Sequence, residues 1–184
     1  MKKAKPVFPR IMKCTAAFSA GMTVLFRFLY THGLGKWMLG AAITFGTICF
    51  HFSMRLFIGL IVPKLFTAVN PMHNWFQPKP WESRLYRFLG IRKWKQYVPT
   101  YAPETFSVGI PPEQLARTMC ISELVHEFIV LFSFLPLFFA IPFGEFSVFL
   151  ITSVIAAAVD CIFILLQRFN RPRVLRILKK RSVS

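Results

Sequence analysis

Four long apolar runs alternate with polar segments along this chain. They cover about residues 14–30, 37–62, 120–141 and 146–166, and each is long enough for an α-helix to cross a bilayer. Arg27 interrupts the first run, and His51 and Arg55 interrupt the second. Only residues 142–145 separate the last two runs, which predicts a tight helical hairpin. The pattern therefore predicts an all-α membrane protein with about four transmembrane helices in a single integral membrane domain, residues 1–184.

The segment between the second and third runs, residues 63–118, has a different character. It carries seven prolines between Pro71 and Pro112, and its aromatic residues are interleaved with charge. Short pieces such as residues 81–94 are typical of amphipathic helices that lie in the membrane interface. We therefore expect an interfacial central region and, after the fourth run, a basic tail over residues 167–184.

Basic residues outnumber acidic ones by 23 to 7, and the net charge is +16. Because these basic residues flank apolar runs, we expect the partners to be membrane lipids with anionic headgroups or phosphorylated substrates, and not nucleic acid. Five Lys or Arg precede the first run, eight lie in the central region and seven follow from Arg168, whereas the two other connections hold only Lys36 and Glu145. The positive-inside rule then predicts that both termini and the central region are cytoplasmic. If the first apolar run lay in the membrane plane and did not cross the bilayer, one basic segment would be placed on the outer side of the membrane.

Several polar side chains lie within the last two apolar runs. If these runs are antiparallel about residues 143–144, Glu127 lies level with Asp160, and His126 lies level with Cys161. One polar pocket near the cytoplasmic surface could then hold Glu123, His126, Glu127, Asp160 and Gln167. Ionisable groups at membrane depth are costly to insert, so we interpret this cluster as a candidate functional site.

Glu123 precedes His126 by three residues, which places the two side chains on neighbouring faces of a helix. A carboxylate that fixes the imidazole tautomer would leave the other ring nitrogen free to take a proton. A Glu–His hydrogen bond that only holds two helices together remains the alternative. We expect no metal, because a di-iron site needs two facing Glu-x-x-His motifs and a zincin needs histidine where Val130 stands.

The fourth run leads directly into the string Gln167-Arg168-Phe169-Asn170-Arg171-Pro172-Arg173. Arginine binds phosphate and carboxylate groups through two parallel hydrogen bonds. The amides of Gln167 and Asn170 are not needed to fix topology, so the string favours a binding role over a plain anchor. Pro172 predicts that the helix ends here.

These segments resemble the glycosyl-4,4'-diaponeurosporenoate acyltransferase family, whose members act in staphyloxanthin-type carotenoid synthesis in bacteria. The resemblance covers about residues 45–181. It rests on Glu123-Leu124-Val125-His126, the hairpin, the string 167–173, the tail 175–181 and, further upstream, Trp81-Glu82, Tyr86, Ile91-Arg92-Lys93-Trp94-Lys95, Pro99 and, weakly, His51. It implies an enzyme of the bacterial plasma membrane that transfers a fatty acyl group to a sugar hydroxyl of a glycosylated lipid such as a glycosyl carotenoid.

The resemblance also implies roles for individual residues. His126, oriented by Glu123 or Asp160, would deprotonate the sugar hydroxyl. The donor would be acyl-CoA or an acyl carrier held by Arg168, Arg171 and Arg173, and no cofactor is implied. Asn170 or Gln167 would donate to the developing oxyanion. Expected substrate-binding residues in the central region are Trp81, Glu82, Trp94 and Lys95; for the tryptophans, an ordinary interfacial aromatic belt is the alternative.

Two other classes of function stay open at this point. One is a different small membrane transferase, resembling a methyltransferase, which would take its group from S-adenosylmethionine rather than from an acyl donor. The other is a non-catalytic assembly or transport component, in which the pocket residues would tolerate alanine.

Overall fold

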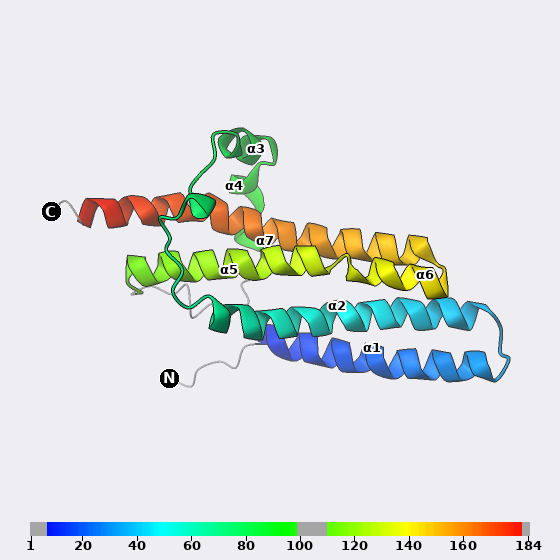
Figure 1. Cartoon of the computed structure of the whole chain (residues 1–184). Helices are drawn as coiled ribbons and strands as arrows, with labels where there is room; N and C mark the ends of the chain where they lie inside the picture. Colours follow the sequence, from blue (N-terminus) through cyan, green and yellow to red (C-terminus); the bar gives the residue numbers. More distant parts are fainter. Residues whose placement is uncertain (1–6, 99–109, 182–184) are drawn as a thin grey trace. The chain divides into compact units, whose positions relative to one another are not determined.

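The computed structural model describes residues 7–98 and 110–181, and these contain helices and connecting segments but no β-strand. Four helical stretches are long and apolar enough to cross a membrane: Pro9–Thr31, Trp37–Leu65, Pro112–Phe143 and Phe146–Lys179. Figure 1 shows their order along the chain. The prediction of an all-α membrane protein with about four transmembrane helices is confirmed.

The third stretch is not one continuous α-helix. It consists of α5 (Pro112–Phe132), the 3-10 helix η4 (Leu135–Phe139) and the short helix α6 (Ala140–Phe143). Pro136 explains the break, because it has no N–H and its ring would clash with the carbonyl of Phe132 in a continuing α-helix. Helix α5 also starts eight residues before the apolar run that predicts it, so it carries polar residues at its beginning.

The last helix, α7 (Phe146–Arg181), is 36 residues long and contains Pro172 in its interior. The expectation that Pro172 ends the helix is therefore wrong. Proline removes one backbone hydrogen bond, to the carbonyl of Arg168, but it does not stop a helix whose two sides are fixed by other contacts. Here Arg171 before the proline and Leu175 after it are both buried, 1% and 5% exposed.

The chain divides into two compact units. The first contains the residues up to Ile61 together with Phe128–Asp160. In it α1 (Val7–Thr31) and most of α2 (Trp37–Leu65) form a hairpin, with the rings of Phe26 and Phe45 stacked at 5.5 Å. The predicted turn before α7 falls at Gly144 and Glu145, both with positive φ.

The second unit contains Val62–Glu127 and the residues from Cys161 onward. Between α2 and α5, the described residues up to 98 form four short helices: η1 (Asn74–Phe76), α3 (Glu82–Phe88), α4 (Ile91–Trp94) and η2 (Lys95–Tyr97). Gly90 joins α3 to α4 with φ +60°, a conformation that costs glycine little. Ile91, fully buried, then fixes the start of α4 in the interior of this unit.

Candidate functional site

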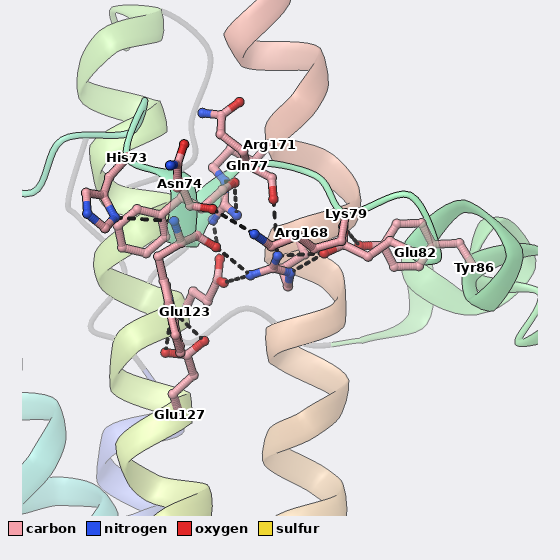
Figure 2. Close-up of polar contacts among 12 residues, drawn as sticks. His73, Asn74, Gln77, Lys79, Glu82, Tyr86, Glu123, Glu127, Arg168 and Arg171 are labelled. Carbon is pink, nitrogen blue, oxygen red and sulfur yellow. Dashed lines mark hydrogen bonds and ion pairs between the residues drawn. The ribbon is translucent and has the colours of Figure 1, made fainter.

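Helix α3 brings a buried carboxylate, Glu82, to helix α7. Glu82 is 2% exposed. Its Oε1 accepts hydrogen bonds from Arg168 Nε (2.8 Å) and Nη2 (2.6 Å), and its Oε2 accepts one from the hydroxyl of Tyr86 (2.8 Å), one helical turn further on. Figure 2 shows Arg168 facing Glu82 on one side and Glu123 on the other.

Helix α5 supplies the second carboxylate, Glu123, which is fully buried. Its Oε1 accepts a hydrogen bond from Arg168 Nη1 at 2.5 Å, and its Oε2 accepts one from Arg171 Nη1. Arg171 also donates from Nε (3.0 Å) and Nη2 (2.6 Å) to the backbone carbonyl of Phe76. Two carboxylates and two guanidinium groups thus neutralise one another.

Spacing along α7 makes this arrangement possible. Arg168 and Arg171 are three residues apart, so both side chains leave the same face of the helix. The loop around η1 completes the hydrogen bonding of Arg168, whose Nη1 and Nη2 donate to the carbonyls of Trp75 (3.2 Å) and Gln77 (3.4 Å). The arginine–glutamate cluster, Glu82, Glu123, Arg168 and Arg171, therefore ties α3, α5, α7 and the 75–77 loop together.

The environment of Tyr86, beside Glu82, favours the protonated form of its phenol. Burial, followed by the hydrogen bond to Glu82 and its negative charge, raises the pKa of Tyr86 well above the usual tyrosine value. The phenol consequently keeps its proton and remains a donor to Glu82 at any physiological pH. Its ring also meets Phe169 edge to face, with centroids 5.3 Å apart.

One turn beyond Glu123, the imidazole of His126 stacks on the ring of Phe163, with centroids 4.7 Å apart and planes 11° from parallel. His126 is only half-buried. The next residue, Glu127, accepts hydrogen bonds from the indole Nε1 of Trp75 at 3.1 Å and 3.2 Å. The face of α5 next to the cluster therefore carries an oriented imidazole and a second held carboxylate.

Beyond the cluster, Lys95 lies against the amide of Asn170. Its Nζ is 3.3 Å from Asn170 Oδ1. Because an ammonium group only donates, this contact turns the amide oxygen toward Lys95, and Asn170 Nδ2 donates to no atom of residues 7–98 or 110–181. Burial, and then the charges of Arg173 and Arg92, lower the pKa of Lys95.

The first unit has its own buried ion pair. Arg55 of α2 donates from Nε (3.1 Å) and Nη2 (2.5 Å) to Asp160 Oδ2, and from Nη2 to the carbonyl of Ala156 (3.0 Å). One turn before Arg55, His51 is 5% exposed, and neither ring nitrogen has a hydrogen-bond partner within the described residues. This pair fixes a charged arginine of α2 inside the helical packing of the unit.

The structure brings some of the predicted site residues together and uses them differently from the prediction. Arg168 and Arg171, predicted to bind donor phosphates, are engaged with carboxylates of the chain itself, while Arg173 is exposed. Glu123, predicted to orient His126, accepts from both arginines. Asp160 belongs to the other unit and pairs with Arg55, so the pocket it was predicted to share with Glu123 stays a prediction.

The remaining predicted residues differ in how accessible they are. Trp81 is 58% exposed, and Gln167 is half-buried. Trp94 donates its indole N–H to the carbonyl of Leu89 at 2.8 Å, a local contact that occupies its only polar group. Within residues 7–98 and 110–181, no group of three or more His, Cys, Asp or Glu side chains is placed to hold a metal ion.

Sequence reasoning missed the partner of Asp160 and the backbone acceptors of Arg171. The signal for the first was present, because a lone arginine within an apolar run requires a carboxylate or carbonyls nearby. For the second there was no signal, because a backbone carbonyl has no sequence signature.

The amino-acid sequence of the second unit resembles that of known proteins. The family model described as glycosyl-4,4'-diaponeurosporenoate acyltransferase matches residues 72–180, more than half of the chain. The chain belongs to the glycosyl-4,4'-diaponeurosporenoate acyltransferase family. Neither the curated proteins nor the solved structures include a match.

Membership of the glycosyl-4,4'-diaponeurosporenoate acyltransferase family confirms the resemblance inferred from the sequence. The matched residues include the whole arginine–glutamate cluster, the Phe76 carbonyl that holds it, and His126 and Asn170 beside it. Helix α1 and α2, with His51 and Arg55, lie outside the match. The family description names an acyl transfer reaction, and the four apolar helices are those of a membrane protein.

Proposed function

We propose that this protein is a membrane acyltransferase that moves a fatty acyl group from a thioester donor to a sugar hydroxyl of a glycosylated lipid, such as a glycosyl carotenoid. Membership of the glycosyl-4,4'-diaponeurosporenoate acyltransferase family is the observation that carries this proposal, because the matched residues contain the arginine–glutamate cluster and both polar groups beside it. The donor is acyl-CoA or an acyl carrier, and the chemistry needs no cofactor.

The buried cluster supports the proposal by acting as a scaffold. It joins α5 to the C-terminal half of α7 through Glu123, Arg168 and Arg171. His126 follows Glu123 by one turn of α5, and Asn170 lies between the two arginines on α7. A base and a hydrogen-bond donor on elements held by buried ion pairs are preorganised, which is the main requirement for electrostatic catalysis.

The reaction assigned to these groups is a direct acyl transfer. A ring nitrogen of His126 takes the proton from the sugar hydroxyl while the hydroxyl oxygen forms a bond to the thioester carbonyl carbon. The Asn170 Nδ2–H donates to the oxyanion that develops, a contact whose loss costs about 3–4 kcal/mol in comparable sites. The carbon–sulfur bond then breaks, and the leaving thiolate takes the proton from the imidazolium.

The cellular arrangement follows from the charge pattern of the sequence. The basic N-terminus, central region and tail would lie on the cytoplasmic side of the bacterial plasma membrane. A water-soluble acyl donor would then approach from the cytoplasm, while the glycosylated lipid acceptor would approach from the surrounding bilayer.

Membranes containing the protein can test this function directly. We expect radiolabel from acyl-CoA to appear in a glycosylated lipid, and His126→Ala to abolish that transfer while the protein accumulates normally. His32→Ala is the matched control, since His32 is exposed and belongs to the α1–α2 connection of the other unit. Label transferred only from S-adenosylmethionine, or full activity of His126→Ala, would contradict the proposal.

A further inference from the structure

Two cations, Lys95 and Arg173, lie against the ring of Phe169, and neither forms an ion pair with a carboxylate of residues 7–98 or 110–181. Lys95 Nζ lies 5.0 Å from the centroid of the Phe169 ring, and Arg173 Cζ lies 5.7 Å from it. Arg92 precedes Lys95 by three residues on the consecutive helical turns α4 and η2, which brings a third charge close to Lys95. Among the residues that the structure describes, none of the three forms an ion pair.

The contrast with the other arginines of the same helix is informative. The guanidinium groups of Arg168 and Arg171 donate their hydrogen bonds to Glu82, Glu123 and backbone carbonyls. Contact with an aromatic face, by comparison, attracts a cation without using any of its N–H groups. In the part of the chain described, Arg173 makes no hydrogen bond and Lys95 makes one, to Asn170. Arg173 and Arg92 are exposed, so their guanidinium groups are accessible.

Two cations held against one ring, with no ion pair to another described residue and with unused N–H donors, match the chemistry of a phosphate group. Like charges held together raise the energy of the unliganded protein, and an anion that binds between them relieves this repulsion.

We propose that Lys95, Arg92 and Arg173, supported by Phe169, form a phosphate-binding site. Resting on the proposed function, we assign the phosphate to the acyl donor, either coenzyme A or the phosphopantetheine of a carrier. The donor-binding role predicted for Arg168 and Arg171 moves to this site, because those two side chains are engaged inside the protein. Asn170 links the site to the reaction, since Lys95 orients the amide that faces the oxyanion.

The test measures binding of free coenzyme A to the protein in nanodiscs of neutral phosphatidylcholine, without turnover. Lys95→Gln and Arg173→Gln should each weaken binding about tenfold, the usual effect of removing one charge-assisted contact. Phe169→Leu should weaken it about twofold to fivefold, since it removes only the aromatic face. Matched controls are Lys93→Gln and Arg176→Gln, exposed cations on the same two segments, which should change binding little.

A second arm identifies the source of the phosphate. The same variants are compared for binding of 3'-dephospho-coenzyme A and for preference for nanodiscs that contain anionic phosphatidylglycerol. Loss of coenzyme A binding alone supports a donor phosphate, and loss of the lipid preference alone supports a phosphate of a lipid headgroup. If neither property changes in the Lys95→Gln/Arg173→Gln double variant, no phosphate site exists here.

Failure of this site and failure of the proposed function can be told apart. Acyl transfer with parental affinity for coenzyme A in the double variant would refute the site and leave the function intact. Coenzyme A binding that depends on Lys95 and Arg173, in a protein that transfers no acyl group, would refute the function and leave the site intact.

Discussion

Replacing Glu123 by glutamine removes one negative charge from the centre of the arginine–glutamate cluster. Glu123 is fully buried and accepts from Arg168 and Arg171, and Arg171 is itself 1% exposed. The amide oxygen of glutamine can keep one of these two hydrogen bonds, but its NH₂ group would face the other guanidinium. Arg171 is then a buried cation whose remaining partner is the carbonyl of Phe76. Loss of one member of a buried ion pair costs about 3–5 kcal/mol.

The same helix supplies a matched control. Glu113 of α5 pairs with Arg117 at 3.0 Å, but both side chains are at least half exposed. An exposed pair of this type contributes about 0.3–0.5 kcal/mol, so Glu113→Gln should be nearly neutral. Both variants make the same chemical change in the same helix, and burial of the ion pair is the main difference between them.

Unfolding of the purified protein in mixed micelles, followed by tryptophan fluorescence, measures the free energy of unfolding of each variant. A double-mutant cycle with Arg171→Met should give a coupling energy of about 2 kcal/mol or more between Glu123 and Arg171, within the range for contacting residues. The double variant should not recover parental stability, because the Phe76 carbonyl loses its donors. If Glu123→Gln costs no more than Glu113→Gln, the cluster does not hold these helices together.

Four further predictions concern other parts of the molecule. His51→Leu should raise the free energy of unfolding by about 1–2 kcal/mol, because it removes two buried nitrogens that have no hydrogen-bond partner among the described residues; a destabilised variant would contradict this. In an alkaline titration followed by tyrosinate absorbance, Tyr86→Phe should remove a component that ionises above the usual tyrosine range. Because the pKa of Tyr86 is raised in the folded protein, the protonated phenol contributes its full stabilisation below about pH 10 and loses it as the pH rises further. Coenzyme A binding should weaken as the pH rises and Lys95 loses its proton. Because the pKa of Lys95 is lowered, this weakening should begin at a pH below that at which lysine usually ionises, and Lys95→Arg should abolish it. In a cysteine-free background, Ser147→Cys should react with an impermeant thiol reagent from outside intact cells and Ser83→Cys should not; the reverse labelling would overturn the predicted topology.

The sequence was sufficient for the parts of the fold that depend on apolar length. Runs of about 20 apolar residues have few alternatives to a membrane helix, so all four helical stretches could be predicted. Helix ends were harder to predict, because polar residues continue α5 and α7 beyond the apolar runs. The prediction that Pro172 ends the last helix was wrong, because the buried contacts on both sides of this proline are not visible in a local sequence pattern.

For the candidate site, residue types could be predicted better than their partners. Glu123 was identified because an ionisable group within an apolar run is unusual, and Arg168 and Arg171 because arginine binds anions; the three do meet in the second unit. Their pairing with one another, rather than with a substrate, depends on where α3 and the 75–77 loop lie. That placement comes from tertiary packing, and no spacing rule in the sequence could provide it.

Under the proposed function, the length of α7 has a consequence for the way a water-soluble donor and a lipid acceptor can meet. At about 1.5 Å per residue, its 36 residues extend about 54 Å, whereas the hydrocarbon layer of a bilayer is about 30 Å thick. With the apolar half of the helix filling that layer, Arg168 and the residues after it reach the headgroups and the water beyond. A thioester could then be cleaved where its soluble carrier remains hydrated and its acyl chain is already among lipid tails. Neither the carrier nor the sugar would have to give up its water, and the acyl chain would not have to leave the bilayer.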